Sequence, residues 1–407
     1  MRNIPSVTCS ILPLLLFAPL ARAGGGSAES AAFEQQLKSK QAPSSNGVLT
    51  DGTAEGKLGN ERMRKANRAA SEIVKARMAR DQQADLALLH EAGQADVVVV
   101  KGVYDRLQDI LAAMDVKHVV LSARLLDELP LLATQTLMIN CPGELSRAAI
   151  ENVRSFVERG GHLVTTDWAL QNVLMKAFPK MVRFRGNATP EDVVAIQVTD
   201  ASDPLLSGVL LQQQRPRWWL ETSSYPISIV DATRVRVLAS SNEMKKKYGD
   251  APVVIAFSYG EGHVLHMTSH LFLQKSRLVT ASERQKGSSF AKGAAKLDDA
   301  SLAAMKGKGI DVDEVASGEL GGAYAMQKLS TNLLVAKQKA NRTLLEGYRG
   351  KVKQDSALET KDGKAVKSGA KVSKDFKVKV LREEGGRALV QDLFGEQGWV
   401  PTQAIER

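Results

Sequence analysis

Residues 135–172, QTLMINCPGELSRAAIENVRSFVERGGHLVTTDWALQN, are the stretch that decides the fold of the largest part of the chain. An apolar run at 137–139 ends in the turn-forming residues 140–143. Apolar residues then recur at helical spacing, Gly160-Gly161 ends the helix pattern, and residues 162–166 have strand character. This order predicts a βαβ unit with a right-handed crossover. Since ligands of such sheets bind beyond the carboxyl ends of the strands, we expect the site close to Asn140 and Asp167.

Two further apolar runs extend this unit towards the N-terminus, at 96–100 and 118–121. Four strands that alternate with three crossovers predict an α/β fold with a doubly wound, mostly parallel, flavodoxin-like sheet. After Trp168 the pattern changes to short strands separated by Pro, Gly and Asp turns, with a hairpin loop at 259–262. The short strands are expected at 193–198, 235–238, 253–257 and 264–267.

The first 23 residues have the features of a signal peptide. Arg2 supplies the positive charge, residues 11–20 form a short apolar core, and Ala21-Arg22-Ala23 is a small-x-small cleavage sequence. The core is too short to span a bilayer. We therefore expect a periplasmic or secreted protein, cleaved near Ala23 and not transmembrane. Removal of this segment leaves Cys141 as the one cysteine, so no internal disulfide is expected.

Composition divides the rest of the chain. Residues 24–95 are expected to be a disordered leader followed by a charged helix of which only the end packs, and 96–342 an α/β domain. Within that domain, the polar segment 275–322 is expected to be a mobile insertion. Residues 350–407 show strand segments separated by glycines, which suit a small C-terminal all-β barrel, and we expect its lead-in, 350–374, to pack loosely.

The formal net charge of +10 is concentrated towards the C-terminus, where residues 337–384 hold fourteen Lys and Arg against seven Asp and Glu. Such a surplus favours an anionic envelope polymer or a protein partner, or it simply solubilises the surface. We do not expect a nucleic-acid partner.

The segment from Asp96 to Arg342 resembles the class I glutamine amidotransferase-like superfamily, and most closely its trehalose-utilisation-like branch, which is often non-catalytic. The residues that carry the resemblance are the turn 140–143 after its strand, Phe156 to Val164, the run 202–209 and Gly260-Glu261-Gly262. The C-terminal module resembles a bacterial Src-homology-3-like barrel, above all in its ending Gly398-Trp399-Val400-Pro401.

The resemblance implies a degraded catalytic triad. Active family members carry a Cys in the tight turn after the strand that follows the Gly-Gly pair, and a His after the last strand. Here that turn holds Asp167 and the bulky Trp168, while His270 stands near the position of the family's His. Cys141 could substitute as nucleophile, but Pro142 offers no N–H for an oxyanion. Asp167 could act as a carboxylate nucleophile or cap a helix.

Several other side chains are expected at the same crevice. Trp218 and Trp219 either stack on a sugar or peptide or cap the core, and His266 and His270 would point to one face of their strand. We read the histidines as structural and expect neither a metal nor a cofactor. The catalytic candidates are Cys141, Asp167 and His270, and the expected crevice residues are Tyr104, Asp105, Asn140, Asp167, Trp168, Trp218, Trp219, His266 and His270.

Three functions are compatible with these features, one of them a purely structural oligomerisation domain. The first is an exported, non-catalytic binding or scaffold protein of the cell envelope that holds a small polar ligand or a protein partner. The alternative is an extracytoplasmic hydrolase that acts on a small polar or carbohydrate substrate in the crevice.

Overall fold

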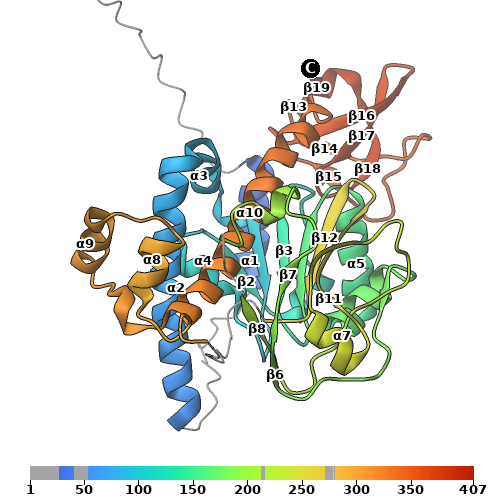
Figure 1. The fold of residues 1–407 in the computed structure, drawn as a ribbon. Coiled ribbons are helices and arrows are strands. Elements are labelled where there is room, and N and C mark those ends of the chain that lie inside the picture. The colour runs from blue at the N-terminus through green and yellow to red at the C-terminus, as the bar shows by residue number, and fades with distance from the viewer. Residues whose placement is uncertain (1–26, 41–53, 212–215, 271–277, 279) are drawn as a thin grey trace, which may run out of the picture.

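The computed structural model describes residues 27–40, 54–211, 216–270, 278 and 280–407. At its centre lies an eight-stranded sheet with strand order β2-β1-β3-β4-β12-β11-β10-β7, covered by helices on both faces (Figure 1). The strands are β1 Val97–Val100, β2 Val119–Leu121, β3 Thr136–Ile139, β4 His162–Thr166, β7 Gln197–Val198, β10 Arg236–Ser240, β11 Pro252–Tyr259 and β12 Gly262–Met267.

The four predicted βαβ strands are confirmed, but the sheet is mixed rather than mostly parallel. The pairings β2–β1, β1–β3, β3–β4 and β4–β12 are parallel. The hairpin of β11 and β12 reverses the chain direction, and β11, β10 and β7 continue the sheet antiparallel. The structure is therefore an α/β fold with a mixed sheet. Smaller two-stranded sheets pair β5 Val182–Arg183 with β9 Ser228–Ile229, and β6 Asp192–Ala195 with β8 Arg217–Leu220.

Each face of the sheet has its own core because side chains alternate along a strand. Val98 and Val100 of β1 pack towards helix α5 (Arg147–Glu158), together with Phe156 of that helix. Val97 and Val99 pack on the other face against α4 (Leu107–Ala113) and α10 (Ser317–Glu346). The remaining short helical segments are η1 Gln94–Asp96, η2 Ala123–Asp127, η3 Leu170–Leu174, α6 Met175–Ala177, η4 Pro204–Leu206, α7 Asn242–Tyr248, η5 Val312–Glu314 and η6 Thr402–Ala404.

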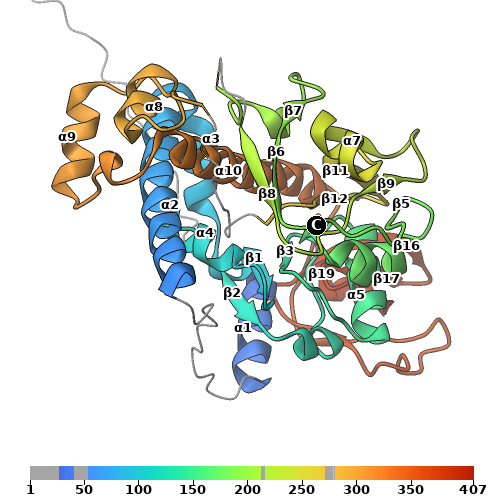
Figure 2. The same ribbon diagram turned by 60° about the horizontal axis from the view of Figure 1, so that its bottom comes forward.

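A helical unit lies beside this α/β core. It corrects the predictions that only the end of the charged helix packs and that residues 275–322 are a mobile insertion. Helices α2 (Ala54–Asp81) and α3 (Gln83–Glu91) pack against α10 on one side of the molecule, and α2 crosses α10 at an angle in both views (Figures 1 and 2). Between Met63 and Met78, one face of α2 is buried, partly through the small residues Ala66, Ala69 and Ala70, which leave no pattern of large apolar residues in the sequence. The segment expected to be a mobile insertion contains α8 (Gly287–Gly293) and α9 (Asp299–Gly307), and Phe290 of α8 is fully buried against Tyr324 of α10.

The N-terminal segment is also more ordered than the composition suggested. Residues expected to be a disordered leader form helix α1 (Ala28–Lys40), and its Phe33 and Leu37 belong to the same core as α5. The hydrophobic contact of these two side chains stabilises a helix whose other residues are small or polar. The predicted signal peptide, residues 1–23, lies outside the described residues. Among the described residues, none of the helices combines the length and the apolar character that crossing a membrane requires.

The C-terminal residues form a separate antiparallel sheet with strand order β18-β17-β16-β13-β19. Its first strand begins at Gly350, four residues after α10 ends at Glu346. The expected loose lead-in is therefore incorrect, since Leu358 and Val372 within it are fully buried. The strands are β13 Gly350–Val352, β16 Lys377–Glu384, β17 Arg387–Asp392, β18 Gln397–Pro401 and β19 Ile405–Glu406, beside the pair β14 Ser356–Ala357 and β15 Lys371–Val372.

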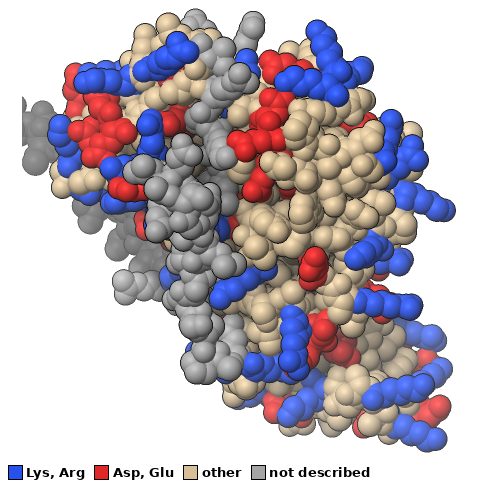
Figure 3. Space-filling view, turned by 90° about the horizontal axis from the view of Figure 1, so that it is seen from below, with Lys and Arg blue, Asp and Glu red and all other residues tan. Residues whose placement is uncertain are grey.

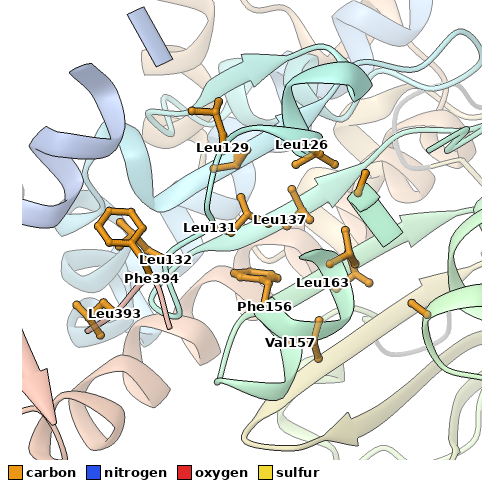
Figure 4. Close-up of a cluster of buried hydrophobic side chains, with 14 of the residues drawn as sticks. Leu126, Leu129, Leu131, Leu132, Leu137, Phe156, Val157, Leu163, Leu393 and Phe394 are labelled. Atoms are coloured by element: carbon orange, nitrogen blue, oxygen red, sulfur yellow. The ribbon is translucent and has the colours of Figure 1, made fainter. Parts of the chain in front are cut away.

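This C-terminal sheet packs against the α/β core at the amino ends of its parallel strands. The N–H of Ala133, just before β3, donates to the carbonyl of Leu393 at 2.9 Å. Leu393 and Phe394 share a hydrophobic cluster with Leu132 and Phe156 (Figure 4). The carboxyl ends of β3, β4 and β12 therefore lie at the opposite end of the molecule from the C-terminal sheet.

Candidate functional site

The turns after β1 and β3 fit closely against each other at the carboxyl end of the sheet. The N–H groups of Val103 and Tyr104 donate to the carbonyl of Cys141 at 3.0 and 3.2 Å. A Cβ on Gly102 would lie 2.2 Å from that oxygen, so only glycine fits there. Asn140 is fully buried, and its side-chain oxygen accepts a hydrogen bond from the N–H of Leu107 at 2.9 Å. Asn140 thus connects the two turns and the start of α4.

Asp167 occupies the sharp turn after β4. Its φ of 45° lies in the left-handed region, which Asp tolerates better than most residues. Its carboxylate accepts hydrogen bonds from the N–H of Tyr225 at 2.8 Å and from the hydroxyl of Ser224 at 3.1 Å. With 1% of its surface exposed, this side chain is held in place by the protein.

Cys141, Asp167 and His270 form a buried cluster at the ends of three neighbouring strands. One side-chain atom from each lies within 4.8 Å of the others, and no more than 2% of any of the three residues is exposed. His270 Nε2 is 3.6 Å from Asp167 Oδ2, and His270 Nδ1 is 3.2 Å from Glu221 Oε2. All three catalytic candidates predicted from the sequence belong to this cluster.

The charges of the cluster favour a protonated histidine beside a neutral thiol. Burial alone would lower the pKa of His270, but its hydrogen bonds to Asp167 and Cys141 and the charge of Asp105 raise that pKa well above its ordinary value. Burial raises the pKa of the Cys141 thiol, and the nearby His270 offsets only part of this shift. A neutral, buried thiol is a poor nucleophile.

Aromatic side chains line the same end of the sheet. Tyr104 is 39% exposed and contacts Trp168 edge to face, with ring centroids 5.2 Å apart. Trp168 stacks on Tyr225 at 5.6 Å, and Tyr225 stacks on Phe184 at 3.8 Å. The indole N–H of Trp168 donates to the carbonyl of Ser223 at 2.7 Å, which fixes the ring. We call Tyr104, Trp168, Tyr225 and Phe184 the aromatic row.

The surface around this end carries charges of both signs. Figure 3, seen from below Figure 1, shows Lys and Arg side chains mainly towards the edges of this face, Asp and Glu side chains both there and nearer its middle, and uncharged surface between them.

Neither the protein-family models nor the curated protein sequences give a match to the chain. Among solved structures, a β-galactosidase from Rahnella sp. R3 is similar over 44% of this chain and 29% of that chain, with 13% identity and a TM-score of 0.31. A ThuA-like protein from Bacteroides uniformis is similar over 44% of this chain and 82% of that chain, with 13% identity and a TM-score of 0.31. A cytoplasmic protein from Salmonella typhimurium has the same identity and TM-score, over 44% and 88%. The chain spans 28% of the length of a GH42 β-galactosidase.

The remaining crevice residues from the sequence lie in different surroundings. Trp218 is 1% exposed and belongs to the core between the sheet and α10, whereas Trp219 faces His270 edge to face at 6.2 Å. His266 is fully buried, its Nδ1 lies 2.8 Å from the hydroxyl of Thr165, and burial lowers its pKa to about 3. Asp105 is buried, and its charge acts on His270.

Two residues of the site were not identified from the sequence. Glu221 and Ser224 follow β8, a strand that pairs with β6 outside the central sheet. Their chain segment returns to the site only through the tertiary fold, and no spacing in the sequence indicates that. The one local signal is the aromatic Tyr225, which is next to Ser224 in the sequence.

Proposed function

We propose that this chain is a non-catalytic binding protein whose α/β domain holds a small polar ligand with a flat apolar face, such as a sugar ring. The observation that carries the proposal is the aromatic row beside buried acidic groups at the carboxyl end of the sheet. Aromatic rings offer flat apolar surface to the C–H face of a sugar, while the partly exposed carboxylate of Glu221 can accept its hydroxyl hydrogen bonds. Tyr104 and Trp168 stand at the exposed end of that row.

The geometry of the cluster supports binding over hydrolysis. Asp167, in the position of a nucleophile, is buried and accepts hydrogen bonds from Tyr225 and Ser224. Cys141 is buried with a raised pKa, and Pro142 after it has no N–H for an oxyanion. An enzyme of the alternative kind needs an accessible nucleophile and preorganised donors at the same place.

Ligand titration tests the proposal. A panel of mono- and disaccharides is titrated into the full-length chain, with heat and tryptophan fluorescence as readouts. Trp168→Ala and Tyr104→Ala should each weaken binding about tenfold or more, because aromatic anchors contribute roughly 2 kcal/mol. Leu381→Ala serves as control, since Leu381 is 41% exposed on the C-terminal sheet, away from the row. Equal affinities in all four proteins would refute the aromatic row as the binding face.

A second measurement distinguishes the proposed binding protein from the alternative hydrolase. If the wild-type chain hydrolyses any sugar of the panel, Cys141→Ala and Asp167→Asn should leave the rate within a few-fold, because neither residue acts as a nucleophile in this proposal. Loss of a true nucleophile would lower the rate by many orders of magnitude. A collapse of the rate in a folded variant would favour the hydrolase.

We further propose that the protein is exported and that its C-terminal sheet, as a Src-homology-3-like module, contacts an anionic envelope polymer. Support comes from the signal-like sequence 1–23 and from exposed lysines on that sheet and its loops, among them Lys353, Lys367 and Lys371. Sequencing the N-terminus of protein from the native cell tests the first part, and an intact Met1 would contradict it. Salt-sensitive binding to an anionic polymer tests the second.

A further inference from the structure

We propose that Cys141, Asp167 and His270 bind one divalent metal ion of the zinc type. The three residues follow β3, β4 and β12, which are adjacent in the sheet. Because these strands are parallel, their carboxyl ends lie side by side, and the residues just after them point one sulfur, one oxygen and one nitrogen towards a common point. Thiolate, carboxylate and imidazole are the ligand types that zinc takes in proteins.

The separations of the candidate ligand atoms suit a tetrahedral ion. At bond lengths of about 2.0–2.3 Å, two ligand atoms of a tetrahedral zinc lie roughly 3.3–3.8 Å apart. The 3.6 Å between His270 Nε2 and Asp167 Oδ2 falls within that range. All three candidate atoms lie within 4.8 Å of one another, so Cys141 needs a movement of no more than about an ångström to complete the set.

The outer contacts are those that orient metal ligands. Glu221 Oε2 faces Nδ1 of His270 at 3.2 Å, on the side of the ring away from Asp167. A ligating histidine characteristically donates its other ring N–H to a carboxylate, which fixes the tautomer and leaves Nε2 for the metal. The hydrogen bonds from Tyr225 and Ser224 hold the Asp167 carboxylate in the same way.

The charge balance also favours a cation. Asp105 and Asp167 are 1% exposed, and together with Glu221 they place three carboxylates around one histidine. This negative charge attracts a cation. A doubly charged ion would be stabilised by it, and three protein ligands leave a fourth position for water or a ligand oxygen. The thiol selects zinc or cobalt over magnesium or calcium.

Cobalt spectroscopy tests the proposal on the full-length, reduced chain after treatment with a chelator. Co²⁺ should bind at one ion per chain, with a thiolate-to-cobalt charge-transfer band and the intense visible bands of four-coordinate cobalt. Added Zn²⁺ should displace both signals and raise the melting temperature. A folded chain that shows neither band, and whose melting temperature Zn²⁺ leaves unchanged, would mean that the cluster is a hydrogen-bonded network only, and would overturn the proposal.

Variants assign the roles within the site. Cys141→Ser should abolish the charge-transfer band, whereas Asp167→Asn should keep the band and weaken affinity. Glu221→Gln should keep all spectral features and weaken affinity about 10–100-fold, as outer partners of a metal do. His263→Ala is the control, because His263 is exposed on β12 and lies outside the cluster. A charge-transfer band that persists in Cys141→Ser would also refute the assignment.

Discussion

Gly102 has no room for a side chain, because the turn after β1 lies directly on the turn that carries Cys141. A Cβ there would be 2.2 Å from the carbonyl oxygen of Cys141 and 2.5 Å from Cβ of Asn140. We expect Gly102→Ala to lower the free energy of unfolding by about 1–3 kcal/mol, since the backbone of both turns must move. Urea denaturation measures this. Gly322→Ala is the matched control, because nothing lies within 4 Å of its Cβ position in α10, and it should stabilise by about 0.5–1 kcal/mol. Equal effects would contradict the steric argument.

Lys337 is 2% exposed on α10, and its ammonium donates to the carbonyls of Ala133 and Gly160 at 2.7 Å each. Burial lowers its pKa to about 7, although the charge of Asp96 acts in the opposite direction. The unfolded chain keeps this proton up to about pH 10.4. Between these two values the unfolded state binds more protons, so this residue makes the fold more stable as the pH rises from about 7.

Lys337→Met removes this pH dependence. The free energy of unfolding of the wild type minus that of the variant should therefore increase between about pH 7 and pH 9, by at most roughly 1.4 kcal/mol per pH unit. Chemical denaturation at several pH values measures the difference. A difference that stays flat or falls over this range would contradict the buried, titrating lysine.

At the site itself, the residues that follow strand ends could be predicted from the sequence, whereas the residues that only the tertiary fold brings there could not. Cys141, Asp167 and His270 could be named because each lies within three residues of the end of a recognisable strand. Their meeting at one point follows from strand order, which the sequence does not specify for β12. Glu221 and Ser224 could not be predicted from the sequence. They follow β8, which pairs with β6 outside the central sheet, so no strand end of that sheet indicates them.

Helices were predicted well where large apolar residues form a stripe and poorly where small ones do. Helix α5 has its apolar face at helical spacing, and Ser146 caps it by accepting from the N–H of Ala149 at 3.0 Å. Helix α2 packs through alanines, which give close contact without a hydrophobic signature. Helix α1 has only Phe33 and Leu37 as large buried apolar residues, too few for a pattern.

Phe33 tests whether α1 is part of the fold. Its side chain is fully buried in the core that includes α5, so Phe33→Ala should cost about 3–5 kcal/mol of stability. Gln35→Ala, exposed on the same helix, should change stability by less than about 0.5 kcal/mol. Thermal and chemical unfolding of both variants gives the comparison. If Phe33→Ala were as stable as Gln35→Ala, α1 would not contribute to the fold, and the prediction of a disordered leader would hold.

On the scale of the whole molecule, the C-terminal sheet and the α/β core share one hydrophobic cluster. The composition of 350–374 suggested a flexible connection because the segment is rich in Lys, Gly and Ser, yet a few buried residues such as Leu358 and Val372 hold it in place. Burial of isolated apolar residues in a polar segment depends on what lies opposite, which local composition cannot reveal.

Leu393 lies at the contact between the two parts, is 2% exposed and shares the cluster with Leu132 and Phe156. Leu393→Ala should cost about 2–5 kcal/mol, and calorimetry of the wild type should show one cooperative transition that includes both sheets. The exposed Leu381 on the same sheet supplies the control, as Leu381→Ala should leave the transition where it is. Two separate transitions in the wild type would show that the sheets unfold independently.

Helix α10 packs on the central sheet, on the helical unit of α2 and α8, and continues within four residues into the C-terminal sheet. Its buried residues include polar ones, such as Asn332, which donates to the carbonyls of Leu205 and Ser207 at 2.9 and 2.8 Å. A substitution in this helix must therefore satisfy several neighbours at once. Over evolutionary time, we expect α10 to accept replacements more slowly than the surface helices, and compensating changes to occur in pairs, one in α10 and one in a unit that packs against it.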